Sequence, residues 1–202
     1  MDYESDALDL VHRKKCDKCD IDGRLPRTHH CKICETCVVK MDHHCQFVNN
    51  CIGYYNHRFF ILLLMHIAIA TSIGVVYSYH YVFEYIFEVY TARGNPFVFM
   101  YNCFTRMHKI AFGAFNFTMC VVLVPFFGFC MYKALVGRTI IEAKIFDKKD
   151  SRQVEKQIAF NRYFNQGWRL NLRVVFGTQS TLIGLILLPW KSKLPEYHEL
   201  ME

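Results

Sequence analysis

The sequence predicts an α-helical membrane protein in which two transmembrane helices carry a small cytosolic zinc-binding domain rich in cysteine. Three observations predict this fold class. Seven of the ten cysteines and four of the ten histidines fall within residues 16–51. Two later runs, residues 59–79 and 110–132, contain no formally charged residue, and about 20 apolar residues suffice to cross a bilayer as a helix. Lysine and arginine gather toward the two ends of the chain.

The cysteine-rich stretch carries thiols at the spacing of metal ligands. A tight turn across two intervening residues directs both sulfurs at one centre, which is the geometry of structural zinc. Two sites of three cysteines and one histidine would use six cysteines and two histidines, leaving one of the seven cysteines over. The cysteines at this spacing are Cys16 and Cys19, then Cys31 and Cys34, with Cys37 one step further.

Cys45 is the best candidate for the remaining cysteine. It follows Asp42, His43 and His44 directly. A thiol beside a histidine, with a carboxylate to hold that histidine, has the parts of an activated nucleophile. The pattern therefore indicates a reactive cysteine next to the zinc sites.

The chain order gives the domain organisation. Residues 1–15 form a polar lead-in, 16–58 the zinc-binding domain, 59–79 a transmembrane helix, 80–109 a lumenal loop, 110–132 a second transmembrane helix and 133–202 a cytosolic C-terminal region. Residues 1–58 carry nine lysines and arginines, 80–109 carry three and 133–202 carry twelve. Positive charge marks the cytosolic side, so we expect both termini in the cytosol. The membrane is an endomembrane (Golgi or ER) or the plasma membrane.

The motif resembles the cysteine-rich domain of the DHHC protein S-acyltransferases (palmitoyltransferases). The resemblance implies one zinc ion bound by Cys16, Cys19, His30 and Cys37, and a second bound by Cys31, Cys34, His44 and Cys51. The positions that carry it are Cys16, Cys19, His30-Cys31, Cys34, Cys37, Asp42-His43-His44-Cys45, Cys51, Asn56 and Phe60. The family's Pro-Trp after the motif is Gln46-Phe47 here.

Two later stretches share this resemblance. Residues 138–142 resemble the Thr-Thr-x-Glu motif that packs beside the catalytic domain in the family. Ile140 replaces its second threonine, so one hydroxyl contact is expected to be missing. Residues 165–177, NQGWRLNLRVVFG, resemble the family's C-terminal segment with its central asparagine, here Asn171. Family members usually have four membrane helices, two of them before the zinc domain. This chain supplies the two after it, so we expect a fragment, a truncated product or a shortened member.

The resemblance implies an enzyme, a protein-cysteine S-palmitoyltransferase, that moves a fatty acyl group from acyl-CoA to protein thiols through an acyl-cysteine intermediate. Cys45 would be the nucleophile, His43 its general base and Asp42 the residue that orients His43. The implied cofactors are two structural zinc ions, with acyl-CoA as co-substrate. The expected partners are membrane lipid, fatty acyl-CoA, cysteine-containing membrane-associated protein substrates and further copies of the chain in an oligomer.

Other functional classes are less consistent with the sequence. The net charge of +6 is spread around two apolar runs, so no nucleic acid is expected as a partner. Residues 16–51 hold an odd number of cysteines, seven, interleaved with histidines, which argues against a secreted disulfide framework. A RING-type ubiquitin ligase normally closes with a Cys-x2-Cys pair, whereas Cys45 and Cys51 are further apart. A non-catalytic zinc-binding membrane scaffold derived from the enzyme family remains the alternative.

Overall fold

The computed structural model describes residues 15–20, 25–91, 96–146, 158, 160–161 and 164–177. Within these ranges the chain is mostly helical, with a small cysteine-rich part built of short strands and turns. It forms two compact units, one of Met1–Leu62 with Cys130–Glu202 and one of Leu63–Phe129. The predicted lead-in, except for Lys15, and residues 178–202 of the predicted C-terminal region lie outside the described residues.

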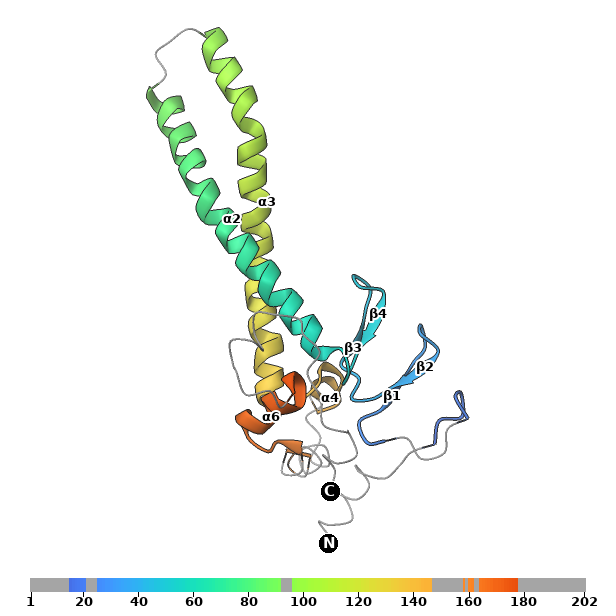
Figure 1. Cartoon of the computed structure of the whole chain (residues 1–202). Coiled ribbons are helices and arrows are strands. Elements are labelled where there is room, and N and C mark those ends of the chain that lie inside the picture. The colour runs from blue at the N-terminus through green and yellow to red at the C-terminus, as the bar shows by residue number, and fades with distance from the viewer. Residues whose placement is uncertain are drawn as a thin grey trace. The chain divides into compact units, whose positions relative to one another are not determined.

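The cysteine-rich part contains two β-hairpins (Figure 1). Strand β1 (His29–Cys31) pairs antiparallel with β2 (Thr36–Val38), and β3 (His43–Cys45) with β4 (Asn50–Ile52). Each strand has only three residues, and an isolated two-stranded hairpin is marginally stable in water. The apolar core around them is correspondingly small. Domains this small commonly draw much of their stability from bound metal.

Two long helices follow the hairpins. Helix α2 spans His57–Thr91 and α3 spans Pro96–Leu135. Both contain a stretch, His57–Phe87 and Arg106–Leu135, that is long and apolar enough to cross a membrane. Within the segment 80–109, which was predicted to connect the two membrane helices, residues 80–91 and 96–109 are helical. The apolar runs were located by their lack of charge. A helix, however, can continue into polar sequence beyond the end of such a run. Pro96 instead begins α3, where its missing N–H costs no hydrogen bond.

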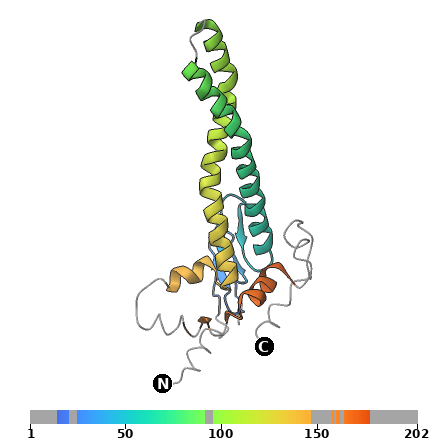
Figure 2. The same ribbon diagram turned by 90° about the vertical axis from the view of Figure 1, so that its left-hand side faces the viewer.

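Helices α2 and α3 pack through small residues in the unit Leu63–Phe129, where they run side by side (Figure 2). A Cβ atom placed on Gly74 would collide with the carboxamide of Asn116, and one on Gly113 would lie 2.8 Å from the Cβ of Ser78. Asn116 also donates a hydrogen bond from Nδ2 to the Phe112 carbonyl at 2.8 Å. Close backbone approach at small residues is the usual basis of helix packing in membranes.

Helices α4 (Ile140–Phe146) and α6 (Trp168–Phe176) come from the C-terminal region. Thr139 and Glu142 form a reciprocal cap at the start of α4: the Thr139 N–H donates to Glu142 Oε2 at 2.7 Å and the Glu142 N–H to Thr139 Oγ1 at 3.3 Å. From α6, the buried Asn171 donates to the Leu135 carbonyl at 2.7 Å. Asn171 lies against Gly137, whose φ of 69° favours glycine. The Asn171 contacts join α6 to the end of α3.

Candidate active site and metal centres

The structure brings together two groups of three cysteines and one histidine. In the first, the Sγ atoms of Cys19 and Cys16 lie 3.2 and 3.7 Å from His30 Nδ1, and the Cys37 and Cys19 sulfurs are 3.7 Å apart. A tetrahedral zinc ion with ordinary bond lengths holds its ligand atoms about 3.5–3.8 Å apart. The donor set and the spacing both fit such an ion. This group is the one that the sequence resemblance implies.

The second group, Cys31, Cys34, His44 and Cys51, has the same form. The Sγ atoms of Cys34 and Cys51 lie 3.3 and 3.7 Å from His44 Nδ1 and 3.5 Å from each other. Cys31 Sγ is 3.7 Å from the same imidazole nitrogen. We name the two groups the first and the second metal cluster. Cys45 belongs to neither of them.

The hairpins explain why these ligands meet. His30 lies directly opposite Cys37 across β1 and β2, and His44 lies opposite Cys51 across β3 and β4. Each cluster combines such a cross-strand pair with the Cys-x2-Cys turn that precedes it in the chain. The clusters are therefore interleaved. The first hairpin supplies the His-Cys pair of the first cluster and the paired thiols of the second.

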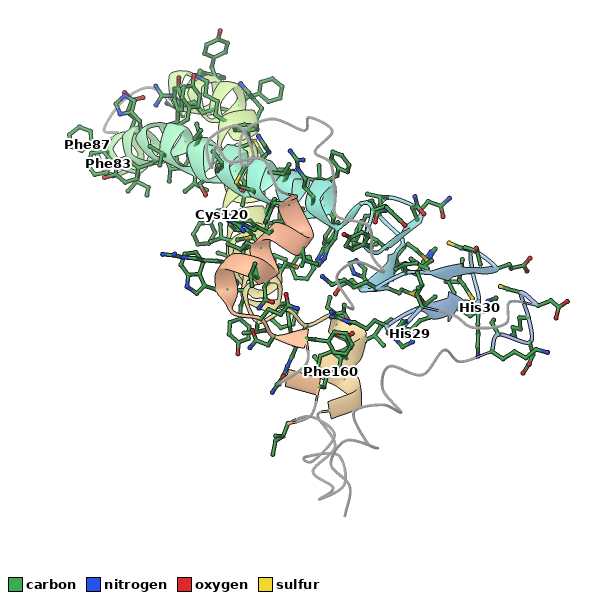
Figure 3. The ribbon with its side chains drawn as sticks, turned by 60° about the horizontal axis from the view of Figure 1, so that its bottom comes forward. His29, His30, Phe83, Phe87, Cys120 and Phe160 are labelled. Carbon is green, nitrogen blue, oxygen red and sulfur yellow. The ribbon has the colours of Figure 1, made fainter. Side chains whose placement is uncertain are left out.

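The two hairpins are also an internal repeat, which the sequence analysis missed. Residues 29–38 read HHCKICETCV and residues 43–52 read HHCQFVNNCI. They form the same strands with the same register and the same burial along their first strands. The signal was present in the sequence, since His-His-Cys occurs twice, at 29–31 and 43–45. Figure 3 shows His29 and His30 on the first of these strands.

Strand geometry separates the two histidines of the second hairpin. Successive side chains on a strand point to opposite faces, so His44 faces the second metal cluster while His43 and Cys45 share the other face. His43 donates from Nδ1 to Asp42 Oδ2 at 2.8 Å, and its ring meets the Phe60 ring edge-on with centroids 5.0 Å apart. Asp42 is only 2% exposed. His43 is thus held by a carboxylate on one side and an aromatic ring on another.

Asp42 is fixed from two directions. Its second oxygen, Oδ1, accepts a 2.7 Å hydrogen bond from the backbone N–H of Ile140 at the start of α4. The sequence analysis expected a lost hydroxyl contact at Ile140, where the family has threonine. The side chain indeed offers no hydroxyl, but its backbone amide reaches Asp42. Helix α4 therefore helps to position the carboxylate that orients His43.

A buried ion pair secures α4 against the cysteine-rich part, and the sequence analysis did not identify it. Arg27 Nε and Nη2 donate to the two carboxylate oxygens of Glu142 at 2.6 and 2.8 Å, and Nη2 also donates to the Gly137 carbonyl at 2.8 Å. The side chains of the pair are 7% and 6% exposed. The guanidinium lies 5.3 and 4.8 Å from the ring centroids of Phe160 and Phe164. No local sequence pattern marks Arg27 as buried.

Charge interactions set the protonation of the site. Burial alone would raise the pKa of Asp42, but the hydrogen bond from His43, the nearby His57 and the Ile140 amide lower it below the ordinary value. Burial lowers the pKa of His43, and its hydrogen bonds to Asp42 and Cys45 outweigh this and raise it. Burial raises the pKa of the Cys45 thiol. The backbone amide of Val48 and the His43 side chain lower this pKa by more, so the net shift is downward. Both shifts act in the direction that eases proton transfer from the Cys45 sulfur to the His43 imidazole.

Lys40 is a second buried charge near this site. It is 4% exposed. Burial, reinforced by the charge of Arg27, lowers its pKa to about 7, although Glu142 and Asp42 act in the opposite direction. Its side chain is therefore partly neutral at neutral pH. Like Arg27, it was not predicted from the sequence.

Comparison with known proteins supports the resemblance that the cysteine-rich motif indicated. The family model for the DHHC palmitoyltransferases matches residues 10–146. Palmitoyltransferase ZDHHC16 of Mus musculus is 34% identical over 197 residues, covering 93% of this chain and 52% of that protein. Probable protein S-acyltransferase 15 of Arabidopsis thaliana is 28% identical over 170 residues, covering 83% of this chain and 62% of that protein. This chain thus spans between about half and two thirds of the length of these relatives. The matched region contains both metal clusters and the Asp42–Cys45 motif, and the chain belongs to the DHHC palmitoyltransferase family.

Proposed function

We propose that this chain is a protein S-acyltransferase that moves a fatty acyl group, typically palmitoyl, from acyl-CoA to cysteine thiols of proteins. The observation that carries the proposal is the arrangement on strand β3. His43, hydrogen-bonded to Asp42 at 2.8 Å, shares a strand face with Cys45, the one cysteine of the described cysteine-rich part that belongs to neither metal cluster. A nucleophile, a base and a residue that orients the base are the parts of an acyl-transfer site.

The reaction has two steps. In the first, His43 takes the proton of Cys45, and the sulfur attacks the thioester carbonyl of acyl-CoA. The bond from the carbonyl to the CoA sulfur breaks, and CoA leaves with the proton from His43. In the second step His43 takes the proton of a substrate cysteine, whose sulfur attacks the acyl group on Cys45. The product is an acylated protein, and the proton returns to Cys45. Such a covalent intermediate divides one difficult transfer into two easier ones.

Asp42 has a supporting role in both steps. Its carboxylate keeps the proton of neutral His43 on Nδ1, so Nε2 can accept a proton from sulfur. The negative charge also stabilises the imidazolium that forms transiently. Helix α4 holds the carboxylate in place through the Ile140 amide. His44 is unsuitable as the base because its Nδ1 lies among the thiols of the second metal cluster.

The two metal clusters have a structural role in this proposal. Bound zinc would cross-link turns and hairpins that are too small to fold through an apolar core. Its ligands would be Cys16, Cys19, His30 and Cys37 in one cluster, and Cys31, Cys34, His44 and Cys51 in the other. The second cluster would set the position of β3 and hence of Cys45.

We further propose that helices α2 and α3 cross an endomembrane or the plasma membrane with both termini in the cytosol. The excess of lysine and arginine in residues 1–58 and 133–202 over residues 80–109 supports this orientation. It would keep the thiols in a reducing compartment, close to acyl chains dissolved in the bilayer. Membrane-associated proteins with accessible cysteines are the matching substrates.

The decisive experiment follows the acyl group on the protein. Purified protein is incubated with labelled palmitoyl-CoA, and hydroxylamine is then added, which cleaves a thioester. We expect a hydroxylamine-labile label in the wild type and none in Cys45→Ser, with the metal content unchanged. His43→Ala should slow labelling by about 100-fold or more, the usual size of a general-base contribution.

Cys120→Ser is the matched control, because Cys120 lies on α3 outside both clusters. It should label at the wild-type rate. A Cys45→Ser protein that still acquires the labile label at the original rate would exclude the mechanism. The non-catalytic zinc-binding scaffold would then be the better description.

A further inference from the structure

Three turns of the cysteine-rich part share one backbone form. Each begins at a cysteine and ends, four residues later, at a residue with positive φ. The opening cysteines are Cys16, Cys31 and Cys45, and the closing residues are Asp20 at 47°, Glu35 at 51° and Asn49 at 46°. In the first two turns the third residue after the opening cysteine is a second cysteine, Cys19 or Cys34. In the third turn this residue is Val48.

The sulfur of Cys45 has the surroundings of a metal-binding thiol. In the turn of the second metal cluster, the backbone N–H of Cys34 donates to Cys31 Sγ at 3.4 Å, and the amide of Ile33 also points to this sulfur. In the third turn the amides of Phe47 and Val48 donate to Cys45 in the same way. Successive backbone N–H groups form a concave site for an anion. The third turn therefore retains the cradle of a metal-binding turn but has one thiol instead of two.

The order of the ligands along the chain explains what is missing. The two thiols of the turn at residues 16–19 share a metal cluster with the His-Cys pair of the first hairpin. Those of the turn at residues 31–34 share one with the His-Cys pair of the second hairpin. The turn of Cys45 lies in the last hairpin, and helix α2 begins at His57 soon after it. Within the described residues, no third hairpin follows to provide another pair.

We propose that Val48 replaces the second ligand of a third metal-binding turn, and that this replacement keeps Cys45 free of zinc so that its sulfur remains available as a nucleophile. The proposal rests on the acyl-transfer function above. It makes Val48 a residue that determines whether the turn binds a metal ion or carries an acyl group.

Ligand number gives the physical reason. A zinc ion with three protein ligands and a water molecule is a common stable arrangement. Cys45 and His43 share one strand face and could supply two ligands. A thiol at position 48 would be the third, at the spacing used by both clusters. Val48 is 41% exposed, so a cysteine or histidine could be accommodated there without overpacking. A zinc-bound thiolate is a poor nucleophile, so the site would lose its acyl-transfer chemistry.

The experiment measures metal content first and acylation second. Purified Val48→Cys and Val48→His proteins are incubated with zinc under reducing conditions and then freed of excess ion. Elemental analysis should give three ions per chain for both variants and two for the wild type. Cobalt replacement should add thiolate-to-metal charge-transfer absorption to the Val48→Cys spectrum. Alkylation of Cys45, followed by peptide mapping, should become slow in both variants and stay fast in the wild type.

Two matched controls separate the position from the added thiol. Phe47→Cys places a thiol on the same turn at the wrong spacing, and Val48→Ala removes the valine without adding a ligand. Both should keep two ions. A mild chelator should remove the third ion of Val48→Cys before the other two, because this site has fewer protein ligands. Acyl labelling of that variant should then rise at least about 10-fold as the sulfur is released.

The outcomes distinguish this proposal from the proposed function. Two ions and fast Cys45 alkylation in both Val48→Cys and Val48→His, with helical content intact, would overturn the proposal whatever the acylation result. A third tightly bound ion at Cys45 in the wild type would overturn it as well. Three ions in the variants together with unlabelled wild-type protein would leave the role of Val48 standing and reject acyl transfer. If both variants misfold, they will lose the two original ions. Zinc titration of the wild type would then test the proposal, because a third tightly bound ion at Cys45 would overturn it.

Discussion

Replacing Glu142 and replacing Arg27 should have unequal effects, although the two residues form one ion pair. Glu142→Gln preserves the shape of the side chain and an oxygen that accepts the Thr139 N–H, but it removes the negative charge that pairs with the buried Arg27. Arginine cannot release its proton inside a protein. Breaking a buried pair in this way costs about 3–5 kcal/mol of the free energy of unfolding. We expect Glu142→Gln to lower the free energy of unfolding by an amount in that range.

Arg27→Met should cost less at neutral pH because Lys40 can take over the pairing. The charge of Arg27 is one of the causes that lower the Lys40 pKa to about 7, while Glu142 raises it. Removing Arg27 therefore raises this pKa, and Lys40 becomes protonated beside Glu142. The remaining loss includes the hydrogen bond to the Gly137 carbonyl and the contacts with two phenylalanine rings. These are worth about 2 kcal/mol together.

The dependence on pH distinguishes the two variants. Below about pH 7, Lys40 is protonated in the wild type and in Arg27→Met, so its contribution to the difference in stability is constant. As pH rises above about 7, wild-type Lys40 is already neutral while Lys40 of the variant loses its proton only at its raised pKa. The penalty of Arg27→Met should therefore grow between about pH 7 and about pH 9, by at most about 1.4 kcal/mol per pH unit. Over the same interval the penalty of Glu142→Gln should stay nearly flat.

The assay is urea unfolding of metal-loaded protein in detergent, followed by circular dichroism at several pH values. Lys144→Met is the matched control, since this lysine is an exposed residue on α4, and it should change stability by less than about 0.5 kcal/mol. Equal penalties for the two pair variants at neutral pH would refute the reasoning. So would an Arg27→Met penalty that does not change between about pH 7 and about pH 9.

Two further predictions concern the base and the membrane helices. The side chain of Asp42→Asn can still accept the Ile140 N–H, but its amide NH₂ would then face His43 Nδ1 and place the ring proton on Nε2. Acyl labelling should therefore fall about 10⁴-fold while two metal ions are retained. Labelling at the wild-type rate would show that Asp42 does not orient His43. Gly74→Ala should destabilise the helix pair by about 1–3 kcal/mol because its Cβ would collide with Asn116. Gly128→Ala should be tolerated, since no described atom lies within 4 Å of its Cβ. Equal losses of stability in thermal unfolding of the two variants would contradict this packing.

Spacing indicated the paired thiols, and the resemblance to the family implied the full sets of candidate metal ligands. Both clusters contain the residues that the motif implies, because Cys-x2-Cys turns are local and their geometry depends on few residues. The two long apolar helices were also located, because a run of about 20 residues without charge is long enough to span a bilayer as a helix. The ends of these helices were not, because charge marks the edge of the bilayer and not the end of a helix.

Residues that act through distant contacts could not be predicted. Arg27 and Glu142 are 115 positions apart, and the contact of Asp42 with the Ile140 amide spans 98. The resemblance of residues 138–142 to a motif that packs beside the catalytic domain indicated the region, but nothing in the local sequence identifies the two partners. The Ile140 substitution was informative about a side chain, but the contact that matters is made by the backbone, which any residue except proline provides. The repeated hairpin was detectable in principle, and it was missed because only its metal ligands were compared.

The interleaving of the two clusters has a consequence for the order in which the protein is made. The ligands of the first cluster are complete at Cys37 and those of the second at Cys51, before α2 begins at His57. A chain synthesised from its N-terminus therefore finishes both ligand sets in succession, and before its first described long apolar helix emerges from the ribosome. Ion capture can thus precede the synthesis of α2 and α3. The strand that bears Cys45 completes its contacts later, because the Ile140 amide reaches the adjacent Asp42 only after α4 has been made.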